Sequence, residues 1–179
     1  MKFNHLKGYE SVTLPTETID GKRYYTTPEG KHYPSVTSVT GLMNRKGIEA
    51  WRKWVGEEQA NKISSQAANR GTRYHYMMED FINNIDIDER LAKATPLDQM
   101  MFNQTREITE KLGDIYMLEG SLYSDELMMA GRVDCIADFA GKISVIDFKT
   151  STKRKTPSRC KSYFVQETAY AKMFEERYQ

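Results

Sequence analysis

The sequence is poor in cysteine and histidine and has no long apolar run. Its two cysteines, Cys135 and Cys160, cannot supply the four thiolates of a structural zinc site or an iron–sulfur cluster. Because no run of about 18 apolar residues occurs, a membrane-spanning helix is not expected. The first residues have neither the apolar core of a secretory signal nor the arginine-rich character of a transit peptide. The composition therefore predicts a protein of a reducing compartment, without an iron–sulfur cluster.

Neither positive nor negative charge is in excess. The net charge is +1, with 39% hydrophobic and 28% charged residues, which is typical of a globular protein. The charges are unevenly distributed, because residues 149–161 include six basic side chains and no acidic one, whereas residues 79–89 include five acidic side chains and no basic one. The sequence lacks a Walker loop, a GxGxxG motif, a Ser-His-Asp arrangement and an HExxH helix. These absences exclude the usual nucleotide-binding, serine-hydrolase and zinc-protease motifs.

Two parts are expected along the chain. Residues 1–55 predict an N-terminal lobe made of a hairpin and helices, and residues 56–179 predict the main core. Within the lobe, residues 1–23 look irregular and loosely attached, and residues 24–33 predict the hairpin. A short helix capped by Ser35 follows, and then a second, separate helix.

The second helix carries Trp51 and Trp54, three residues apart. Tryptophans at helical spacing usually pack into a core, and this interpretation is favoured. Stacking of the indole rings on nucleic-acid bases is the alternative.

A long amphipathic helix is predicted from Gly56 to Asn83. A histidine, His75, lies on its apolar face, where a histidine is usually a core residue. One turn earlier, Gly71 lowers helix stability, which predicts that another element approaches the helix closely there. The remaining apolar stripe comprises Ala60, Ile63, Ala67, Met78 and Ile82.

The stretch after this helix predicts a solvated acidic loop over residues 83–95 and another helix beginning at Pro96. Residues 116–122 predict a strand that contains a lone acid, Glu119, which is either outward-facing or a metal ligand. The last helix is expected at about residues 163–178.

The most informative stretch lies on either side of Ala140-Gly141. Apolar and polar residues alternate there with a period of two, which predicts a hairpin with a two-residue turn. In a hairpin centred on this turn, Asp134 lies directly opposite Asp147. Lys149 is two residues beyond Asp147 and projects from the same face.

Two carboxylates at directly opposed positions repel one another unless one takes up a proton or a cation lies between them. A solvated strand face is the alternative explanation of this pattern. The second strand is otherwise apolar on both faces, which indicates burial, and buried charges must be paired or coordinated. The pattern therefore favours a hydrolytic metal site over an exposed surface.

Five short motifs follow one another along the chain. They are G-T-x-x-H (Gly71–His75), a lone acid (Glu119), G-x-x-D (Gly131–Asp134), D-x-K-T (Asp147–Thr150) and Q-x-x-x-Y (Gln166–Tyr170). In this order and spacing they resemble the RecB-type branch of the PD-(D/E)xK nucleases, and most resemble the group of the mitochondrial genome maintenance exonuclease and its phage relatives. Y-P-S-V-T at residues 33–37 and the two-tryptophan helix also resemble that group, so the resemblance covers residues 24–178.

The resemblance implies an α/β (α+β) fold of the restriction-endonuclease type, with a mixed central sheet flanked by helices. It implies a site for Mg²⁺ or Mn²⁺ in which Lys149 activates the attacking water and Glu119 lies beside the metal. The implied metal ligands are His75, Asp134, Asp147 and the backbone carbonyl of Phe148. The resemblance implies that Gln166 and Tyr170 hold the substrate backbone or brace Lys149. The basic run after Lys149 predicts further contacts to a phosphate backbone, from Thr150, Lys153, Arg154 and Lys155. From the residues alone, Gln166 and Tyr170 could equally cap a sheet edge.

The expected function is that of a Mg²⁺-dependent DNA exonuclease that degrades single-stranded DNA from free ends. A structure-specific endonuclease using the same site is one alternative, and a non-catalytic DNA-binding module is another, which the retained acids disfavour. DNA is the expected partner, no membrane partner is expected, and the expected location is the cytoplasm of a bacterium or a phage-infected cell. The resemblance also implies further strands after the last helix, which this sequence does not contain.

Overall fold

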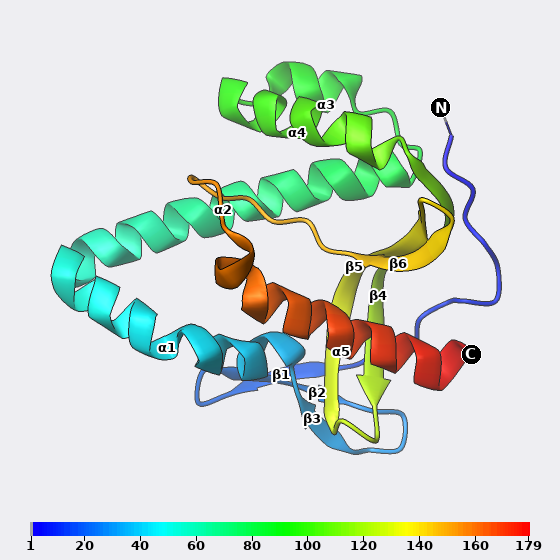
Figure 1. Cartoon of the computed structure of the whole chain (residues 1–179), viewed down its shortest axis with the longest axis horizontal. Helices are drawn as coiled ribbons and strands as arrows, with labels where there is room; N and C mark the ends of the chain where they lie inside the picture. Colours follow the sequence, from blue (N-terminus) through cyan, green and yellow to red (C-terminus); the bar gives the residue numbers. More distant parts are fainter. Residues whose placement is uncertain (1) are drawn as a thin grey trace.

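The computed structural model describes residues 2–179 and has the predicted combination of helices and sheets (Figure 1). The first sheet has the order β1-β2-β3, formed by Thr16–Ile19, Lys22–Thr26 and His32–Pro34. The second sheet has the order β4-β5-β6, formed by Leu112–Ser124, Met129–Phe139 and Lys142–Ile146. The helices are α1 (Val36–Val55), α2 (Glu57–Ile82), α3 (Asp88–Lys93), α4 (Pro96–Thr109) and α5 (Lys161–Tyr178), with a 3₁₀ turn, η1 (Pro157–Cys160), before α5.

Strand pairing within both sheets is antiparallel. Among residues 2–179, parallel pairing is confined to two isolated bridges, His5 with Ile115 and Ser35 with Ala130. The mixed α and β class is confirmed, and the parallel component of the expected mixed sheet is limited to these bridges.

The predicted central hairpin is confirmed in its register. Cys135 pairs with Ile146, and the turn between β5 and β6 is formed by Ala140 and Gly141 with φ values of 52° and 78°. Two consecutive positive φ values are typical of the turn that matches the twist of antiparallel strands. Asp134 and Asp147 are the next residues in this register, although β6 itself ends at Ile146.

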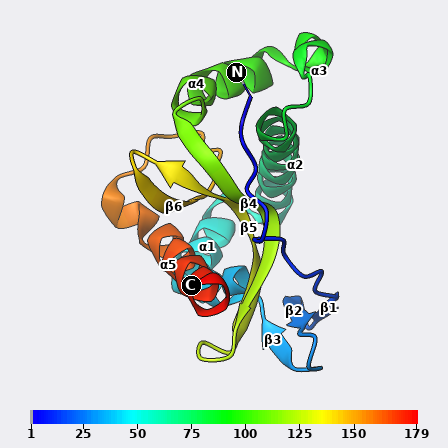
Figure 2. The ribbon, with the colours of Figure 1, turned by 90° about the vertical axis from the view of Figure 1, so that its right-hand side faces the viewer.

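Helices cover both faces of the β4-β5-β6 sheet, with α2 on one side and α5 on the other (Figure 2). On the α2 side, Met78 and Phe102 pack with Cys135 and Ala137 of β5. On the α5 side, Met173 packs with strand residues that include Val133 and Ile136. Because both faces are covered, the carboxylates of Glu119 on β4 and Asp134 on β5 are largely withdrawn from water, with 17% and 13% of their side chains exposed.

The two helices expected before residue 56 form one continuous helix, α1, so the predicted separation into two helices is wrong. Ser35 caps it as predicted, because its Oγ accepts the Ser38 N–H at 3.0 Å. The chain turns at Gly56, whose φ of 85° and ψ of 149° suit glycine and little else. The helices α1 and α2 diverge from the sheet and meet at this corner, at the left of Figure 1.

The N-terminal segment is attached more firmly than its polar sequence predicts. Within it, Phe3 is buried in the α2-side core, and the Leu6 N–H donates to the Ile115 carbonyl at 2.8 Å. Residues 16–19 form strand β1, which the sequence pattern did not reveal. Met1 lies outside the described residues. The expected loop over residues 83–95 also contains a short helix, α3.

No helix among residues 2–179 has the length and apolar character that crossing a lipid bilayer requires.

Candidate metal and nucleic-acid site

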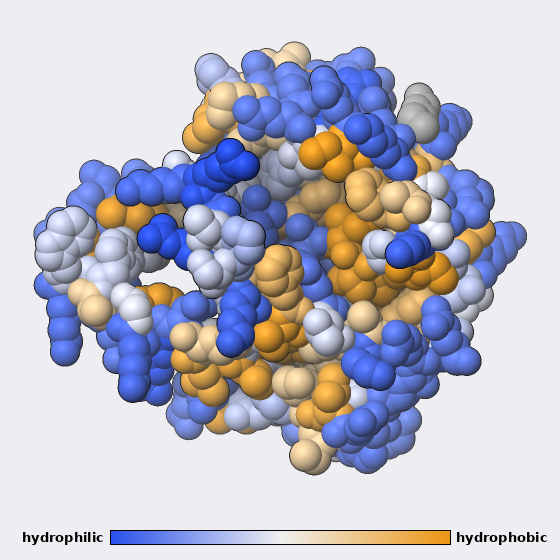
Figure 3. Space-filling view, in the orientation of Figure 1, coloured by the Kyte–Doolittle hydropathy of each residue, from blue (hydrophilic) through white to orange (hydrophobic). Residues whose placement is uncertain are grey.

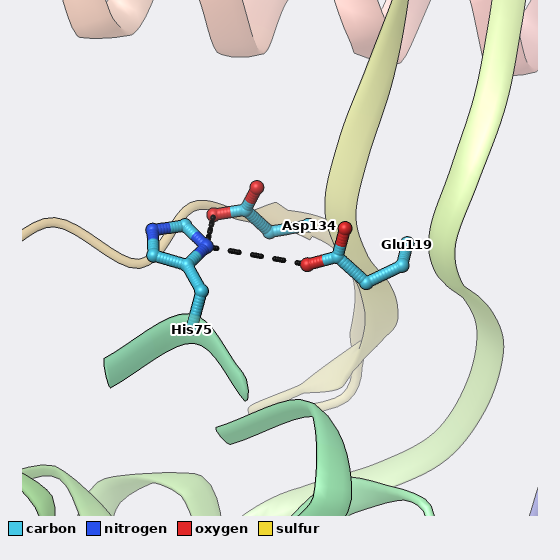
Figure 4. A group of neighbouring side chains, drawn as sticks. All are labelled: His75, Glu119 and Asp134. Carbon is cyan, nitrogen blue, oxygen red and sulfur yellow. Dashed lines mark ion pairs between the residues drawn. The ribbon is translucent and has the colours of Figure 1, made fainter. Parts of the chain in front are cut away.

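Three side chains from three elements meet where α2 crosses the central sheet. His75 comes from α2, Glu119 from β4 and Asp134 from β5, and their side chains point toward one another (Figure 4). His75 Nδ1 lies 3.6 Å from Asp134 Oδ2 and 4.0 Å from Glu119 Oε1. One ligand atom from each residue lies within 4.8 Å of the others, a separation that a single metal ion could bridge.

The position of His75 follows from the packing of α2. The residues just before and after it, Tyr74, Met77 and Met78, are buried against the sheet. This packing holds the imidazole over the strands with 30% of its side chain exposed. The neighbouring carboxylates of Glu119 and then Asp134 raise the pKa of His75, while burial opposes them.

Asp134 is held by the chain that follows β6. Its Oδ2 accepts the backbone N–H of Phe148 at 2.8 Å, and only 13% of its side chain is exposed. Burial, reinforced by the charge of Asp147, raises the pKa of Asp134 to about 6, against the opposing charges of His75 and Lys149. The N–H of Phe148 therefore makes the contact that the structure shows, while a role for its carbonyl as a metal ligand stays a prediction.

Asp147 lies beside this group and has other partners. Its Oδ1 accepts from Lys149 Nζ at 2.5 Å and from Gln166 Nε2 at 3.1 Å, and its side chain is 4% exposed. Within residues 2–179, its Oδ2 is buried and has no hydrogen-bond partner. Leaving a buried carboxylate oxygen unpaired is costly, so this atom offers a lone pair to a cation.

The donor set suits a hard divalent cation. The carboxylate oxygens match the preferences of Mg²⁺ and Mn²⁺, whereas the imidazole nitrogen is a ligand more typical of softer divalent ions such as Zn²⁺. His75, Glu119 and Asp134 provide the facing atoms, and the unpaired oxygen of Asp147 provides a fourth candidate.

An arginine that the sequence analysis did not single out also belongs to this site. Arg132 Nε lies 2.8 Å from Glu119 Oε2 and donates to the Glu119 carbonyl at 2.9 Å. The available signal was the period of two, which places Arg132 two residues before Asp134 on β5.

Tyr170 and Gly131, from two of the motifs, pack against each other. Tyr170 is 2% exposed, and a Cβ atom added at Gly131 would lie 2.7 Å from its hydroxyl oxygen. Gly131 therefore leaves the space that Tyr170 fills. Burial raises the pKa of the tyrosine hydroxyl.

The prediction for Gly71 is wrong. A Cβ atom added there would meet nothing within 4 Å, so no element approaches the helix closely at this residue.

A cavity of about 540 Å³ lies beside Asp147 and Lys149. The basic residues Lys153, Arg154 and Lys155, which we call the basic loop, line it together with Thr150. Aromatic residues that the sequence analysis did not assign to the site, Tyr74 and Tyr163, also line it. The ring of Tyr163 lies 4.4 Å from Lys155 Nζ and 5.9 Å from Lys149 Nζ.

The two tryptophans do not both pack into a core. Trp54 is 83% exposed, the highest value among the large hydrophobic side chains that the structure describes, and Trp51 is half-buried. The favoured core interpretation is therefore wrong for Trp54, and the alternative of base stacking stays open for it.

Comparison with known proteins finds relatives that share one name. No family model matches it. Mitochondrial genome maintenance exonuclease 1 of Homo sapiens is 27% identical over 68% of this chain and 38% of its own length. The protein of the same name from Xenopus tropicalis is 27% identical over 84% of this chain and 47% of its own length, and that from Mus musculus is 26% identical over 68% and 38%. The chain thus spans less than half the length of these relatives.

Proposed function

We propose that this chain is a metal-dependent DNA exonuclease with a site of the PD-(D/E)xK type. The observation that carries the proposal is the meeting of His75, Glu119 and Asp134 beside a buried, partly unpaired Asp147. Lys149, at the wall of an adjoining cavity that is lined by basic residues, completes the arrangement. The likeness to three proteins whose names describe an exonuclease of genome maintenance supports the proposal.

The metal of this proposal is Mg²⁺ or Mn²⁺, held by His75, Glu119, Asp134 and Asp147. Such an ion lowers the pKa of a bound water and neutralises charge on the phosphate. A cation nearby would favour the ionised form of Asp134, since burial and then the charge of Asp147 raise its pKa to about 6.

Lys149 acts on the attacking water in this proposal. Its ammonium is held by Asp147 Oδ1 and is 35% exposed, so it is fixed on one side and accessible from the cavity on the other. From this position Nζ orients the water and stabilises negative charge on the phosphate. Gln166 acts indirectly, because its amide group holds the Asp147 carboxylate that in turn holds Lys149.

The basic loop contacts the phosphate backbone in this proposal. Its side chains are exposed and line the cavity beside Lys149. Neutralising phosphates with such side chains releases counterions, which gives a salt-dependent affinity.

Single-stranded DNA with a free end is the substrate that the shape favours. An opening passes through the molecule between α1, α2 and the segment before α5, as Figure 3 shows when compared with Figure 1. A linear strand can enter an enclosed opening from its end, whereas a closed circle cannot. Trp54, near the corner where α1 and α2 meet, offers an exposed ring on which a base can stack.

An assay with end-labelled linear and closed circular single-stranded DNA tests the proposal, with Mg²⁺ or Mn²⁺ and with EDTA. We expect the linear strand alone to be degraded, only when metal is present. Cutting of circles would show an endonuclease instead, and tight binding without cutting would show a DNA-binding module.

Lys149→Ala and Asp147→Ala are the informative variants. We expect each to lower turnover by roughly 10³-fold or more, which corresponds to about 4 kcal/mol of activation free energy. Binding of single-stranded DNA to Lys149→Ala should persist, because the basic loop remains. Wild-type cleavage by Lys149→Ala would exclude the proposed role of the lysine.

A further inference from the structure

Glu119 has an unusual backbone conformation for a residue inside a strand. Its φ is 50°, in the left-handed region, although its neighbours Leu118 and Gly120 pair regularly with β5. A residue other than glycine is strained in that region, and such strain persists only where the surroundings impose it. Some contact must therefore hold Glu119 in place.

Arg132 supplies that contact. Its Nε–H donates to the Glu119 carbonyl oxygen at 2.9 Å, and Nε also lies 2.8 Å from the carboxylate oxygen Oε2, with which the guanidinium forms an ion pair. The guanidinium of Arg132 thus contacts both the strained backbone and the side chain of Glu119. The other carboxylate oxygen, Oε1, lies on the side of His75, at 4.0 Å from Nδ1.

We propose that Arg132 is a positioning residue of the metal site, which holds Glu119 so that one carboxylate oxygen is bound by the guanidinium and the other is free for the metal. The inference rests on the proposed function, since it assigns Glu119 as a metal ligand. It goes beyond the motif resemblance, in which Arg132 occupies an unspecified position.

An ordinary surface ion pair is the competing explanation. Arg132 is 55% exposed, and exposed pairs contribute little to stability. Such a pair, however, gives no reason for the second contact to the Glu119 carbonyl or for the left-handed φ value. If the pair were only a surface contact, removing Arg132 would leave metal affinity unchanged.

The experiment measures Mn²⁺ binding by isothermal titration calorimetry, without DNA. We compare wild type with Arg132→Gln, Arg132→Lys and Glu119→Ala, and use Arg106→Gln as the matched control. Arg106 of α4 is 48% exposed, and its Nε also lies 2.8 Å from a carboxylate, that of Glu110 just after this helix. Melting temperatures of all variants confirm that they fold.

We expect Arg132→Gln to weaken Mn²⁺ binding by at least about tenfold, and Arg132→Lys to restore part of the loss, because lysine keeps the charge but not the planar guanidinium. Arg106→Gln should bind like wild type. In the double variant Arg132→Gln with Glu119→Ala, binding should be no weaker than in Glu119→Ala alone, because the arginine acts through the glutamate.

Equal Mn²⁺ affinity of wild type and Arg132→Gln overturns the inference and leaves the proposed function standing. Weak binding by Arg132→Gln, combined with a wild type that binds Mn²⁺ but does not cleave DNA, overturns the proposed function and supports the inference. A wild type that binds no Mn²⁺ overturns both.

Discussion

The two halves of helix α2 follow the same spacing of apolar residues but have different surroundings. In the C-terminal half, Met78 and Ile82 are fully buried against the central sheet, and His75 lies among them. In the N-terminal half, Ala60 is buried but Ile63 is 38% exposed, and Trp54, just before this half at the end of α1, is 83% exposed. The C-terminal half holds His75 in a fixed position over the sheet, whereas the N-terminal half leaves apolar surface exposed.

The largest expected difference between the two halves of α2 is in how much the free energy of unfolding falls when a large apolar side chain is replaced by alanine. Met78→Ala should lower the free energy of unfolding by about 2–5 kcal/mol, because it removes a fully buried side chain and leaves a cavity. Ile63→Ala should change it by less than about 0.5 kcal/mol, because the side chain is partly solvated already. Chemical denaturation of both variants measures the difference. Equal losses would mean that α2 is packed along its whole length.

The sheet beneath the C-terminal half of α2 should also show an electrostatic cost to the free energy of folding, which comes from the buried Asp134 on β5. The pKa of Asp134 in the folded protein is about 6, above its usual value of 3.8. Folding therefore favours the protonated form, so stability falls as the pH rises from about 4 to about 6 and stays lower above that range. Asp134→Asn removes this cost while its amide oxygen can still accept the Phe148 N–H.

In EDTA at about pH 7, we expect Asp134→Asn to be more stable than wild type by up to roughly 3 kcal/mol. At about pH 3.5 the two proteins should nearly converge, because Asp134 is then protonated in the folded state and mostly protonated in the unfolded state. Adding Mn²⁺ should raise the melting temperature of wild type and not that of the variant. A variant less stable than wild type at neutral pH would show that the carboxylate stabilises the metal-free fold.

The smallest expected effect is on the affinity for DNA. It concerns Trp54, at the end of α1 next to the N-terminal half of α2. Trp54→Ala should weaken binding of single-stranded DNA by about 1–3 kcal/mol, the usual contribution of one stacked base. Its melting temperature should not change, since the ring is 83% exposed. Fluorescence anisotropy in EDTA, in an Asp147→Ala background, measures the affinity without cleavage. Met100→Ala, at a 49% exposed side chain of α4, is the control, and an equal loss in this control would remove Trp54 from the binding surface.

Local patterns predicted the hairpin because its geometry is decided locally. A period of two and a turn at Ala140-Gly141 set which residues face each other, so the register was correct through Cys135 and Ile146. The cap at Ser35 and the helix beginning at Pro96 were found for the same reason, since each depends on neighbouring residues.

Predictions failed where a distant partner decides the outcome. Trp54 has helical spacing like a core residue but is 83% exposed. Gly71 lies on the same stripe as the buried Met78, yet within residues 2–179 nothing lies within 4 Å of its Cβ position. Conversely, the polar N-terminal segment is held against the protein because Phe3 packs into the core formed by α2 and α4. Spacing identifies a face of a helix or strand but does not say what lies opposite it.

The sequence by itself determined that two acids and a lysine gather at the end of one hairpin, because backbone periodicity and turn chemistry act over a few residues. The tertiary structure decided how these groups divide their partners. Asp147 pairs with Lys149 and with Gln166 from α5, whereas Asp134 faces His75 from α2 and Glu119, which Arg132 holds. Hydrogen bonds and ion pairs depend on separations of a few ångströms between elements far apart in the chain, and only packing sets those separations.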